Sequence, residues 1–306
     1  MSPTSSRPVD VPELVDSLGW TPHALKPTIV GRLLRRKAVV LSSLVVIFTV
    51  LLALFADQIA PFNDHQMGAL INAPAGVLDP TSHLMHWMGT DDLGRDIFSR
   101  LLYGIRISLT VGFAADALIT AIGVAVGLTS GYFSGVVDNL LMRFTDVMYA
   151  FPSLVLAMVM VATFGRSFGA VLIALGVSNW VGMARLVRGQ VLQVKELDYV
   201  LAAHSLGARP LAIMLRHILP NVLGPVIILA TLIIPGVMTA EAALAYLNVG
   251  MDPSLPTLGG LINSGSVNIF SHPSEIAFPV LTLASLTLAF TLLGDGMRDT
   301  LDPHLR

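Results

Sequence analysis

The chain has 306 residues, of which 54% are apolar, 12% are charged and none is cysteine. Because soluble globular proteins carry roughly a quarter charged residues, an ordinary soluble domain is excluded, and the surface needs a lipid bilayer to cover it. A formal net charge of −2 gives no indication of nucleic acid as a partner. The absence of cysteine excludes disulfides, thiolate metal sites and thiol nucleophiles.

Residues 1–37 are rich in serine, proline and charge, and they contain no apolar run long enough for the core of a signal peptide. We expect them to form a cytosolic tail that ends in basic residues. Residues 38–56 follow as a charge-free stretch of the length that crosses a bilayer as a helix. Because further apolar segments come after it, an uncleaved first transmembrane helix is expected. The basic residues of the tail's end are Arg32, Arg35, Arg36 and Lys37.

Five later segments have the length and composition of membrane spans. They are residues 108–133, 140–163, 170–189, 222–247 and 277–295. Backbone groups inside a bilayer must pair within their own segment, so the sequence predicts an all-α membrane protein with six transmembrane helices. Cytosolic termini place most basic residues on the inner side and leave residues 248–276, which contain no Lys or Arg, outside.

Three arginines of the first outer loop are exceptions to this charge distribution. They are Arg95, Arg100 and Arg106. We expect residues 94–104 to form an amphipathic helix at the membrane interface, with its arginines reaching the headgroups. Three aspartates are expected to pair with Arg95 and Arg100 in a surface network that fixes the turn into the second span. They are Asp91, Asp92 and Asp96.

The same loop contains His65, His83 and His86. A three-residue spacing is weak support for a metal site and no further ligand is identifiable, so we expect exposed histidines and no metal centre. The chain also lacks the GxxxxGK[ST] loop that holds ATP phosphates. No nucleophile–base spacing or paired metal-ligand motif indicates a catalytic site, so an intramembrane enzyme is disfavoured.

Several spans contain glycine or proline, which permit close helix contacts and bends. Two explanations account for these residues equally well. One is a bundle that moves, and the other is that glycine and proline are generally common in membrane helices. They are Gly123, Gly127, Pro152, Gly176, Gly182, Pro225 and Pro235.

Carboxylates inside predicted spans are costly in hydrocarbon, so each should face the bundle interior or lie near an interface. Asp146 lies one turn after Arg143 and is expected to pair with it. Asp116 and Glu241 can either line a water-filled path or hold helices together, and the sequence leaves both open. Two residues of the fourth span are weaker candidates for the same path, Asn179 and Trp180.

The segment between the fourth and fifth spans reads DYVLAAHSLGARPLAIMLRHILPN from Asp198 to Asn221. It is too polar to span a membrane. We expect Asp198 to cap a helix of about two turns that ends at Gly207, and a second helix to start at Pro210 and run to Pro220. The first helix presents the small residues Ala202, Ala203 and Ser205, which let the surface of another protein come close.

This segment resembles the signature loop of the permeases of ATP-binding-cassette (ABC) importers, where two alanines, a glycine and an Ile-Leu-Pro mark the coupling helix. The matching residues here are Ala202, Ala203, Gly207, Ile218, Leu219 and Pro220. The resemblance implies that they contact a cytosolic ATPase together with Leu201 and Ser205. Where the family usually has Glu, this chain has Leu201; a Glu there could complete a capping box with Asp198 or pair with a basic residue of the ATPase. We expect an apolar contact from Leu201 instead.

Three further stretches resemble the C-type permeases of the dipeptide, oligopeptide and nickel branch. They are MGTDDLGRDIFSRLLYGIRISL from Met88, EAALAYLNVGMDPSLPTLGG from Glu241 and LLGDGMRDTLDPHLR from Leu292. In the second, Asn248 and Leu258 stand where the branch usually has glycine and tryptophan. The resemblance implies a type I importer fold with residues 106–295 as a five-helix core. Its other parts are the tail 1–37, a first span with its outer loop at 38–105, and a cytosolic tail at 296–306, with the coupling helix at about 198–210.

The resemblance also implies partners: a B-type permease, two cytosolic ATPases that bind ATP and Mg²⁺, and an external substrate-binding protein, all at the bacterial inner membrane. This chain would itself hold no cofactor and would form half of a path for dipeptides or oligopeptides. Nickel or another small solute is the alternative cargo. A stand-alone carrier driven by an ion gradient is the alternative from another functional class.

Overall fold

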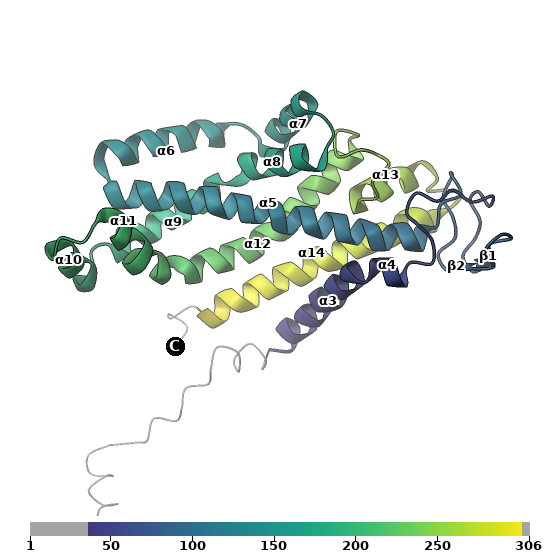
Figure 1. Ribbon diagram of the computed structural model, residues 1–306, viewed down its shortest axis with the longest axis horizontal. Coiled ribbons are helices and arrows are strands. Elements are labelled where there is room, and N and C mark those ends of the chain that lie inside the picture. The colour runs from purple at the N-terminus through teal and green to yellow at the C-terminus, as the bar shows by residue number, and fades with distance from the viewer. Residues whose placement is uncertain (1–35, 302–306) are drawn as a thin grey trace, which may run out of the picture.

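The computed structural model of the chain describes residues 36–301. The expected amino-terminal tail, apart from its last two residues, lies outside this range, as do residues 302–306. The described part is an elongated helical bundle (Figure 1). A small loop domain, residues 60–96, lies at one end, and the short helix α10 (Asp198–Ser205) lies at the other. We call these the loop-domain end and the α10 end.

Four helices are long and apolar enough to cross a membrane without a break. They are α3 (Lys37–Leu54), α5 (Ile97–Phe133), α12 (Leu219–Tyr246) with the turns that precede it, and α14 (Pro273–Leu301). Two bent pairs of helices also qualify when each pair is taken as one span. They are α6 (Gly135–Ala150) with α7 (Ser153–Phe164), and α8 (Phe168–Asn179) with α9 (Val181–Val194). The six predicted spans therefore correspond to four continuous helices and two bent pairs.

Helix α5 begins eleven residues before the span predicted from hydropathy, at Ile97, and is 37 residues long. At 1.5 Å per residue it extends ~55 Å, well beyond the ~30 Å hydrocarbon core of a bilayer. The side chain of Asp96 accepts a hydrogen bond from the Ser99 amide and caps this helix. The separate interfacial helix expected at residues 94–104 is therefore wrong, because most of that segment is the first part of α5.

The third predicted span is broken, with an angle of 85° between α6 and α7. Pro152 lies at the break and cannot donate a backbone hydrogen bond, and the residue before it, Phe151, is extended with φ −87° and ψ 131°. The span predicted at 140–163 is thus the bent pair α6–α7, and the bend lies at Pro152, one of the prolines named as permitting bends. The fourth predicted span bends less, by 44°, where α8 meets α9 next to Trp180.

Helices α5 and α9 pack closely along a row of glycines four residues apart on α5. A Cβ atom at Gly127 would lie 2.5 Å from the Ala184 carbonyl oxygen and 2.7 Å from the Val187 Cβ atom of α9. Gly123 and Gly131 meet the same helix one turn to either side. The predicted close contact is confirmed for Gly123 and Gly127, since small residues let the backbones approach. Gly182 has no neighbour that a Cβ would touch within 4 Å.

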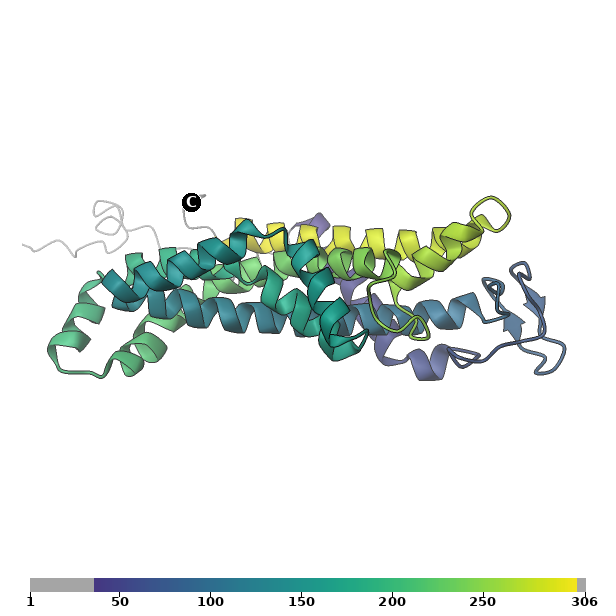
Figure 2. The same cartoon turned by 90° about the horizontal axis from the view of Figure 1, so that it is seen from above.

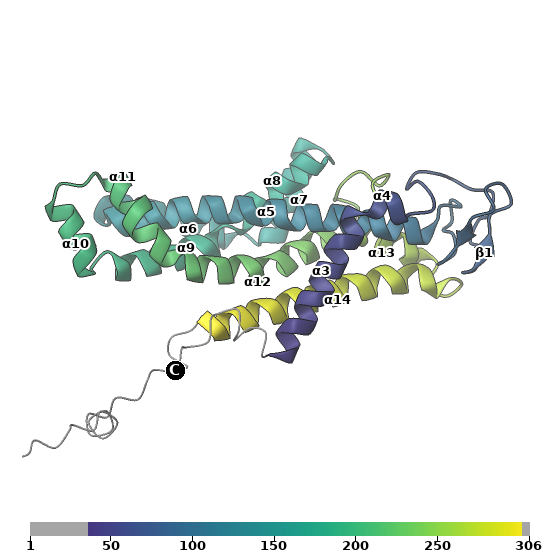
Figure 3. The same ribbon diagram turned by 60° about the horizontal axis from the view of Figure 1, so that its bottom comes forward.

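Helix α3 crosses α14 on one face of the bundle (Figure 3). Arg36, just before α3, forms an ion pair with Asp299 near the carboxyl end of α14. The start of the first long helix and the end of the last therefore lie together, as an even number of spans requires. Helix α14 continues to Leu301, so the predicted tail at 296–306 begins as helix.

The loop domain follows the short helix α4 (Ala56–Ile59) and contains the strands β1 (Val77–Leu78) and β2 (Met85–His86). The strands are antiparallel, with Val77 opposite His86. Figure 2 shows this domain projecting beyond the helices at one end. Helix α13 (Leu258–Val267) packs against α14 and α12 near the same end. The all-α prediction holds apart from these two short strands.

Candidate functional site

Helix α10 is an exposed, separately capped helix at one end of the bundle (Figure 1). We call residues 198–220 the docking loop. Val200 is buried and anchors α10, whereas the large apolar side chains of Leu201 and Leu206 are exposed. Leu206 is 88% exposed. Apolar side chains this open to solvent in a small loop indicate a surface made for another protein.

The carboxyl end of α10 is fixed by a Schellman motif around Gly207. The Gly207 amide donates to the His204 carbonyl at 3.0 Å, and the Ala208 amide donates to the Ala203 carbonyl at 3.1 Å. Gly207 has φ +77°, a left-handed conformation that only glycine adopts without strain. The predicted helix end at Gly207 is thereby confirmed.

The amino end of α10 differs from the prediction. Leu197 is the N-cap and Asp198 is the first helical residue, without a side-chain capping hydrogen bond. Residue 201 is then the fourth residue of the helix, so a Glu there would not complete a capping box with Asp198. Asp198 still carries its negative charge in the first turn, where it interacts favourably with the helix dipole.

The second half of the docking loop enters the bundle. Pro210 is the first residue of α11 (Pro210–Ile213), as predicted. The chain continues through a π-helical turn, Met214–Ile218, directly into α12, so the predicted end at Pro220 is wrong. Ile218 is fully buried, Leu219 is half-buried and Pro220 is exposed. Of the residues implied to contact an ATPase, several are thus exposed at the surface, whereas Ile218 packs in the core; the exposed ones are Leu201, Ala202, Ser205, Gly207 and Pro220.

A groove of about 380 Å³ lies between α10 and the end of α5. It is lined by Tyr132, Phe133, Lys195, Val200, Leu201 and His204. Lys195 donates to the Ser134 hydroxyl at 2.6 Å and to the Gly131 carbonyl at 3.2 Å, which joins the end of α9 to the end of α5. The docking loop is therefore attached to the bundle through α9 as well as through α12.

Glu241, a candidate for the translocation path, is 1% exposed and lies between three helices. Its carboxylate accepts a hydrogen bond of 3.0 Å from Ser108 of α5, and the Ser108 hydroxyl accepts one of 3.1 Å from the Leu258 amide of α13. Asp116 of α5 is also buried. Asn179 donates to the Leu175 carbonyl within α8, and Trp180 is buried and stacked on Phe144.

Asp146 pairs with a different arginine from the one expected. Its Oδ1 atom lies 2.8 Å from Nη2 of Arg185 on α9, whereas the prediction named Arg143 of its own helix. A second pair was not foreseen: Arg188 of α9 donates two hydrogen bonds, of 2.6 and 2.7 Å, to the two carboxylate oxygens of Asp138. The spacing of the aspartates, eight residues apart on one side of α6, was the available signal for both.

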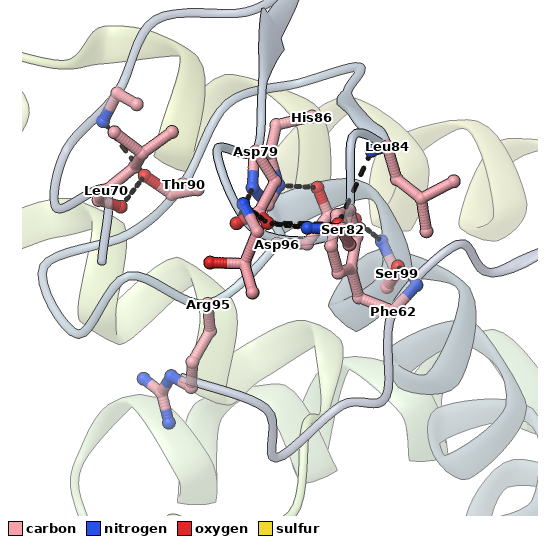
Figure 4. A network of polar contacts seen from close by, with 12 residues as sticks. Phe62, Leu70, Asp79, Ser82, Leu84, His86, Thr90, Arg95, Asp96 and Ser99 are labelled. Carbon is pink, nitrogen blue, oxygen red and sulfur yellow. Dashed lines mark hydrogen bonds and ion pairs between the residues drawn. The ribbon is translucent and has the colours of Figure 1, made fainter. Parts of the chain in front are cut away.

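The loop domain contains a buried polar cluster (Figure 4). His86 Nδ1 lies 2.8 Å from Asp96 Oδ1, and the His86 ring stacks on Phe62 at 4.3 Å. His86 was expected to be exposed, and this is wrong because the stack and the carboxylate enclose it. The backbone amide of Ser82 donates to Asp79 at 2.7 Å and lowers the pKa of that carboxyl. Within residues 36–301, no group of three or more potential ligands is arranged to hold a metal ion.

Of the ion pairs predicted at the start of α5, those of Asp91 with Arg95 and Arg100 are present and largely buried, whereas Asp96 pairs with His86. Asp91 accepts from Arg95 Nε at 2.9 Å and from Arg100 Nη1 at 2.6 Å. Gly89 and Gly94, the flanking glycines, have positive φ. Arg106 lies outside this network and contacts Asp57 and the Ala53 carbonyl, and its hydrogen bonds lower the pKa of Asp57. The prediction of a surface network is thus wrong in its burial, and Asp92 stays exposed.

Comparisons with known proteins identify the family to which this helical bundle belongs. The family described as "Binding-protein-dependent transport system inner membrane component" matches residues 123–306. The chain belongs to this family. A second family, described as the N-terminal TM domain of oligopeptide transport permease C, matches residues 28–75. The chain is therefore a permease subunit of the C type, as predicted.

Curated relatives of this permease agree over most of its length. The oligopeptide transport system permease protein OppC of Bacillus subtilis is 36% identical over 88% of this chain and 87% of its own. The dipeptide transport system permease protein DppC of the same organism is 42% identical over 72% of this chain and 69% of its own. The glutathione transport system permease protein GsiD of Pectobacterium atrosepticum is 36% identical over 90% of each chain.

Solved structures of lower identity share the fold. An inward-facing structure of the MetNI methionine ABC transporter has a TM-score of 0.52 and 16% identity, and the match covers 67% of this permease and 98% of that chain. An amino acid ABC transporter solved with histidines has a TM-score of 0.50 and the same identity, over 65% of this permease and 92% of that chain. The predicted fold of an ABC importer permease, type I, is thus confirmed.

Proposed function

We propose that this permease forms half of the translocation path of an ATP-driven importer of dipeptides or oligopeptides. Relatives named for oligopeptides, dipeptides and glutathione support short peptides as the cargo. The second half of the path would come from a B-type permease. ATP and Mg²⁺ would be bound by two cytosolic ATPases, and an external binding protein would deliver the peptide at the bacterial inner membrane.

The observation that carries the proposal is the exposed helix α10 with its capped end at Gly207. An eight-residue helix that buries one apolar side chain and exposes Leu201, Leu206 and the small Ala202 offers a convex surface to a partner's cleft. In this reading an ATPase binds α10, and its movement on ATP binding is passed to α9 and α12. Leu201 makes an apolar contact with the ATPase, which replaces the polar contact of the usual Glu.

Glu241 fits this proposal as a residue that holds helices together. A path shared by two permeases is lined by side chains that each isolated chain exposes, and the carboxylates of Glu241 and Asp116 are buried within this one. The contacts of Glu241 with Ser108, and through it with Leu258, support a structural role between α5, α12 and α13. We assign Asn179 and Trp180 to the surroundings of the bend between α8 and α9.

Reconstitution of the permease with its B-type partner, the two ATPases and the binding protein in lipid vesicles tests the proposal. Uptake of labelled dipeptides, tripeptides and pentapeptides is measured together with ATP hydrolysis. We expect uptake that needs both hydrolysable ATP and the binding protein, and competition among peptides. Uptake by this chain alone under a proton gradient would select the ion-driven carrier, and uptake of Ni²⁺ that no peptide inhibits would select the metal as cargo.

A further inference from the structure

Helix α6 buries few of its apolar side chains in the bundle, although Phe144 stacks on Trp180 and Met148 packs against the core. Of its 16 residues, Thr145 is buried, whereas the large apolar side chains of Val136, Leu140, Phe144 and Val147 are all exposed. Its partner helix α7 turns away by 85°. Since lipid tails are as apolar as these side chains, helices in a bilayer are held together by close packing and by polar contacts between them, and α6 depends on such contacts to keep its position.

Two ion pairs to α9 supply these contacts. Asp138 near the start of α6 receives both hydrogen bonds of the Arg188 fork, and Asp146 two turns later pairs with Arg185. The Arg185 guanidinium also lies over the Tyr149 ring, 4.4 Å from its centroid. Asp138 is mostly buried and accepts a further hydrogen bond from Ser130 of α5. Both acidic residues of this face of α6 thus reach one helix, α9.

Helix α9 connects this attachment to the docking loop. It is packed against the glycine row of α5, where neither helix can rotate without a clash of backbone and side chain. It ends at Val194, and α10 begins four residues later at Asp198. Lys195, between them, also holds the corner between α5 and α6 through Ser134. A displacement of α10 therefore moves α9, and the charged contacts carry the movement to α6.

We infer that the Asp138–Arg188 and Asp146–Arg185 pairs are the link through which the docking loop positions α6. The inference rests on the proposed function, because it presumes that an ATPase acts on α10. It assigns a coupling role to four residues outside the signature loop. Ion pairs suit this role since bidentate charged hydrogen bonds fix direction as well as distance.

The Asp146–Arg185 pair is about half exposed to solvent and contributes little to the stability of the bundle, whereas Asp138 of the other pair is mostly buried. A purely structural role and a coupling role therefore predict different results. Loss of a stabilising contact lowers the amount of folded complex and leaves each remaining complex fully active. Loss of a link leaves the complex assembled and able to hydrolyse ATP, but with fewer peptides imported per ATP.

The experiment uses the reconstituted importer with Asp138→Asn, with Arg188→Gln, and with the exchange of both residues, Asp138→Arg plus Arg188→Asp. We expect each single variant to lower the number of peptides imported per ATP about tenfold, since it removes a bidentate charged contact. The exchange should restore most of the ratio. Asp57→Asn is the matched control: it removes an ion pair with Arg106 at the loop-domain end and should leave the ratio unchanged.

An unchanged peptide-to-ATP ratio in Asp138→Asn would overturn the inference, provided that the unaltered complex shows ATP-dependent uptake. If that complex shows none, the proposed function itself fails. If the single variants do not assemble, the exchange decides: assembly with a restored ratio supports the link, and assembly with a low ratio contradicts it. Should the exchange fail to assemble as well, Asp146→Asn at the more exposed pair gives the same reading, and an unchanged ratio there rejects the inference.

Discussion

Arg100 is a guanidinium that is 4% exposed, and its charge is balanced by Asp91 at 2.6 Å. Asp91→Ala would leave this charge buried without its partner. Breaking a buried pair in this way costs about 3–5 kcal/mol. We expect a clear fall in the midpoint of thermal unfolding of the purified permease in detergent, because the start of α5 and the loop domain both depend on this contact.

The control for this variant is Asp57→Ala, which removes the exposed ion-pair partner of Arg106. Asp57 and Arg106 are both reached by solvent, and Arg106 keeps its hydrogen bond to the Ala53 carbonyl. Exposed pairs contribute little, so the midpoint should hardly move. Equal shifts for the two variants would show that burial does not decide the strength of these pairs.

Gly207 is the residue at which the backbone of the docking loop can be tested directly. A branched side chain at φ +77° is strained even though the space around it is open, since no atom lies within 4 Å of a built Cβ. We expect Gly207→Val to lower ATP-driven uptake about tenfold, from a strain of 1–3 kcal/mol in the helix end. Gly207→Ala should have a smaller effect.

Gly189 offers a matched position for this substitution. It lies inside α9 at an ordinary helical φ, and it too has no neighbour within 4 Å. Gly189→Val should therefore leave uptake close to that of the unaltered chain. Full uptake by Gly207→Val, measured as peptide accumulated in ATP-loaded vesicles, would reject a role for the shape of this helix end.

At single residues, some features of the structure could be predicted from the sequence and others could not. The left-handed conformation of Gly207 could be predicted, because a glycine that follows a short helix commonly adopts it to end the helix. The pairing of Asp146 could not, because neighbours on the same helix were the visible candidates, whereas Arg185 comes close only after the chain has bent twice between α6 and α9. The burial of His86 depends on Phe62 and Asp96, one on each side of it in the sequence.

The α5–α9 pair is the rigid element to which the docking loop is joined. Gly127→Ala would place a methyl group 2.5 Å from the Ala184 carbonyl oxygen, so the two backbones must separate. Overpacking of this kind costs about 1–3 kcal/mol. We expect a lower thermal midpoint in detergent, together with a smaller uptake rate, because the two helices no longer move as one.

Gly182→Ala on α9 is the comparison for this variant, since its Cβ would meet no atom within 4 Å. Alanine favours the helix over glycine by up to about 1 kcal/mol, so the midpoint should stay the same or rise. An equal fall of the thermal midpoint in both variants would indicate that close packing at the α5–α9 contact does not limit the size of residue 127.

The sequence predicted which helices exist better than it predicted where they end and bend. Hydropathy located every span, because apolar residues are excluded from water over the full width of a bilayer. It placed the start of α5 too late, since Arg100 and Arg106 interrupt the apolar pattern although their charges are paired. It located α6 and α7 as one span but not the 85° between them, since composition carries no information on the direction of the chain after Pro152.

At the scale of the whole molecule, the two ends of the bundle differ in structure. The α10 end exposes a small helix for a partner, whereas the loop domain at the opposite end is stabilised by buried polar contacts of its own (Figure 2). The pairing of Arg36 with Asp299 at the open ends of α3 and α14 agrees with an even number of crossings. The predicted orientation, with α10 in the cytosol, then follows from the distribution of basic residues.

The absence of native cysteine makes this orientation testable with single introduced thiols. Ser205 is exposed on α10, and Phe270, in the turn between α13 and α14, is 101% exposed. In sealed right-side-out vesicles, a maleimide that cannot cross membranes should label Phe270→Cys at once and label Ser205→Cys only after permeabilisation. The two residues lie at opposite ends of the bundle, so the bilayer separates them.

Met183→Cys completes this experiment, because Met183 is fully buried against α5. It should resist the reagent with and without permeabilisation and react only after unfolding, which shows that labelling reports access and not thiol chemistry. Labelling of Ser205→Cys in sealed vesicles would place α10 outside. An ATPase in the cytosol then could not reach it, and neither the docking role of α10 nor the transmission through α9 to α6 could hold.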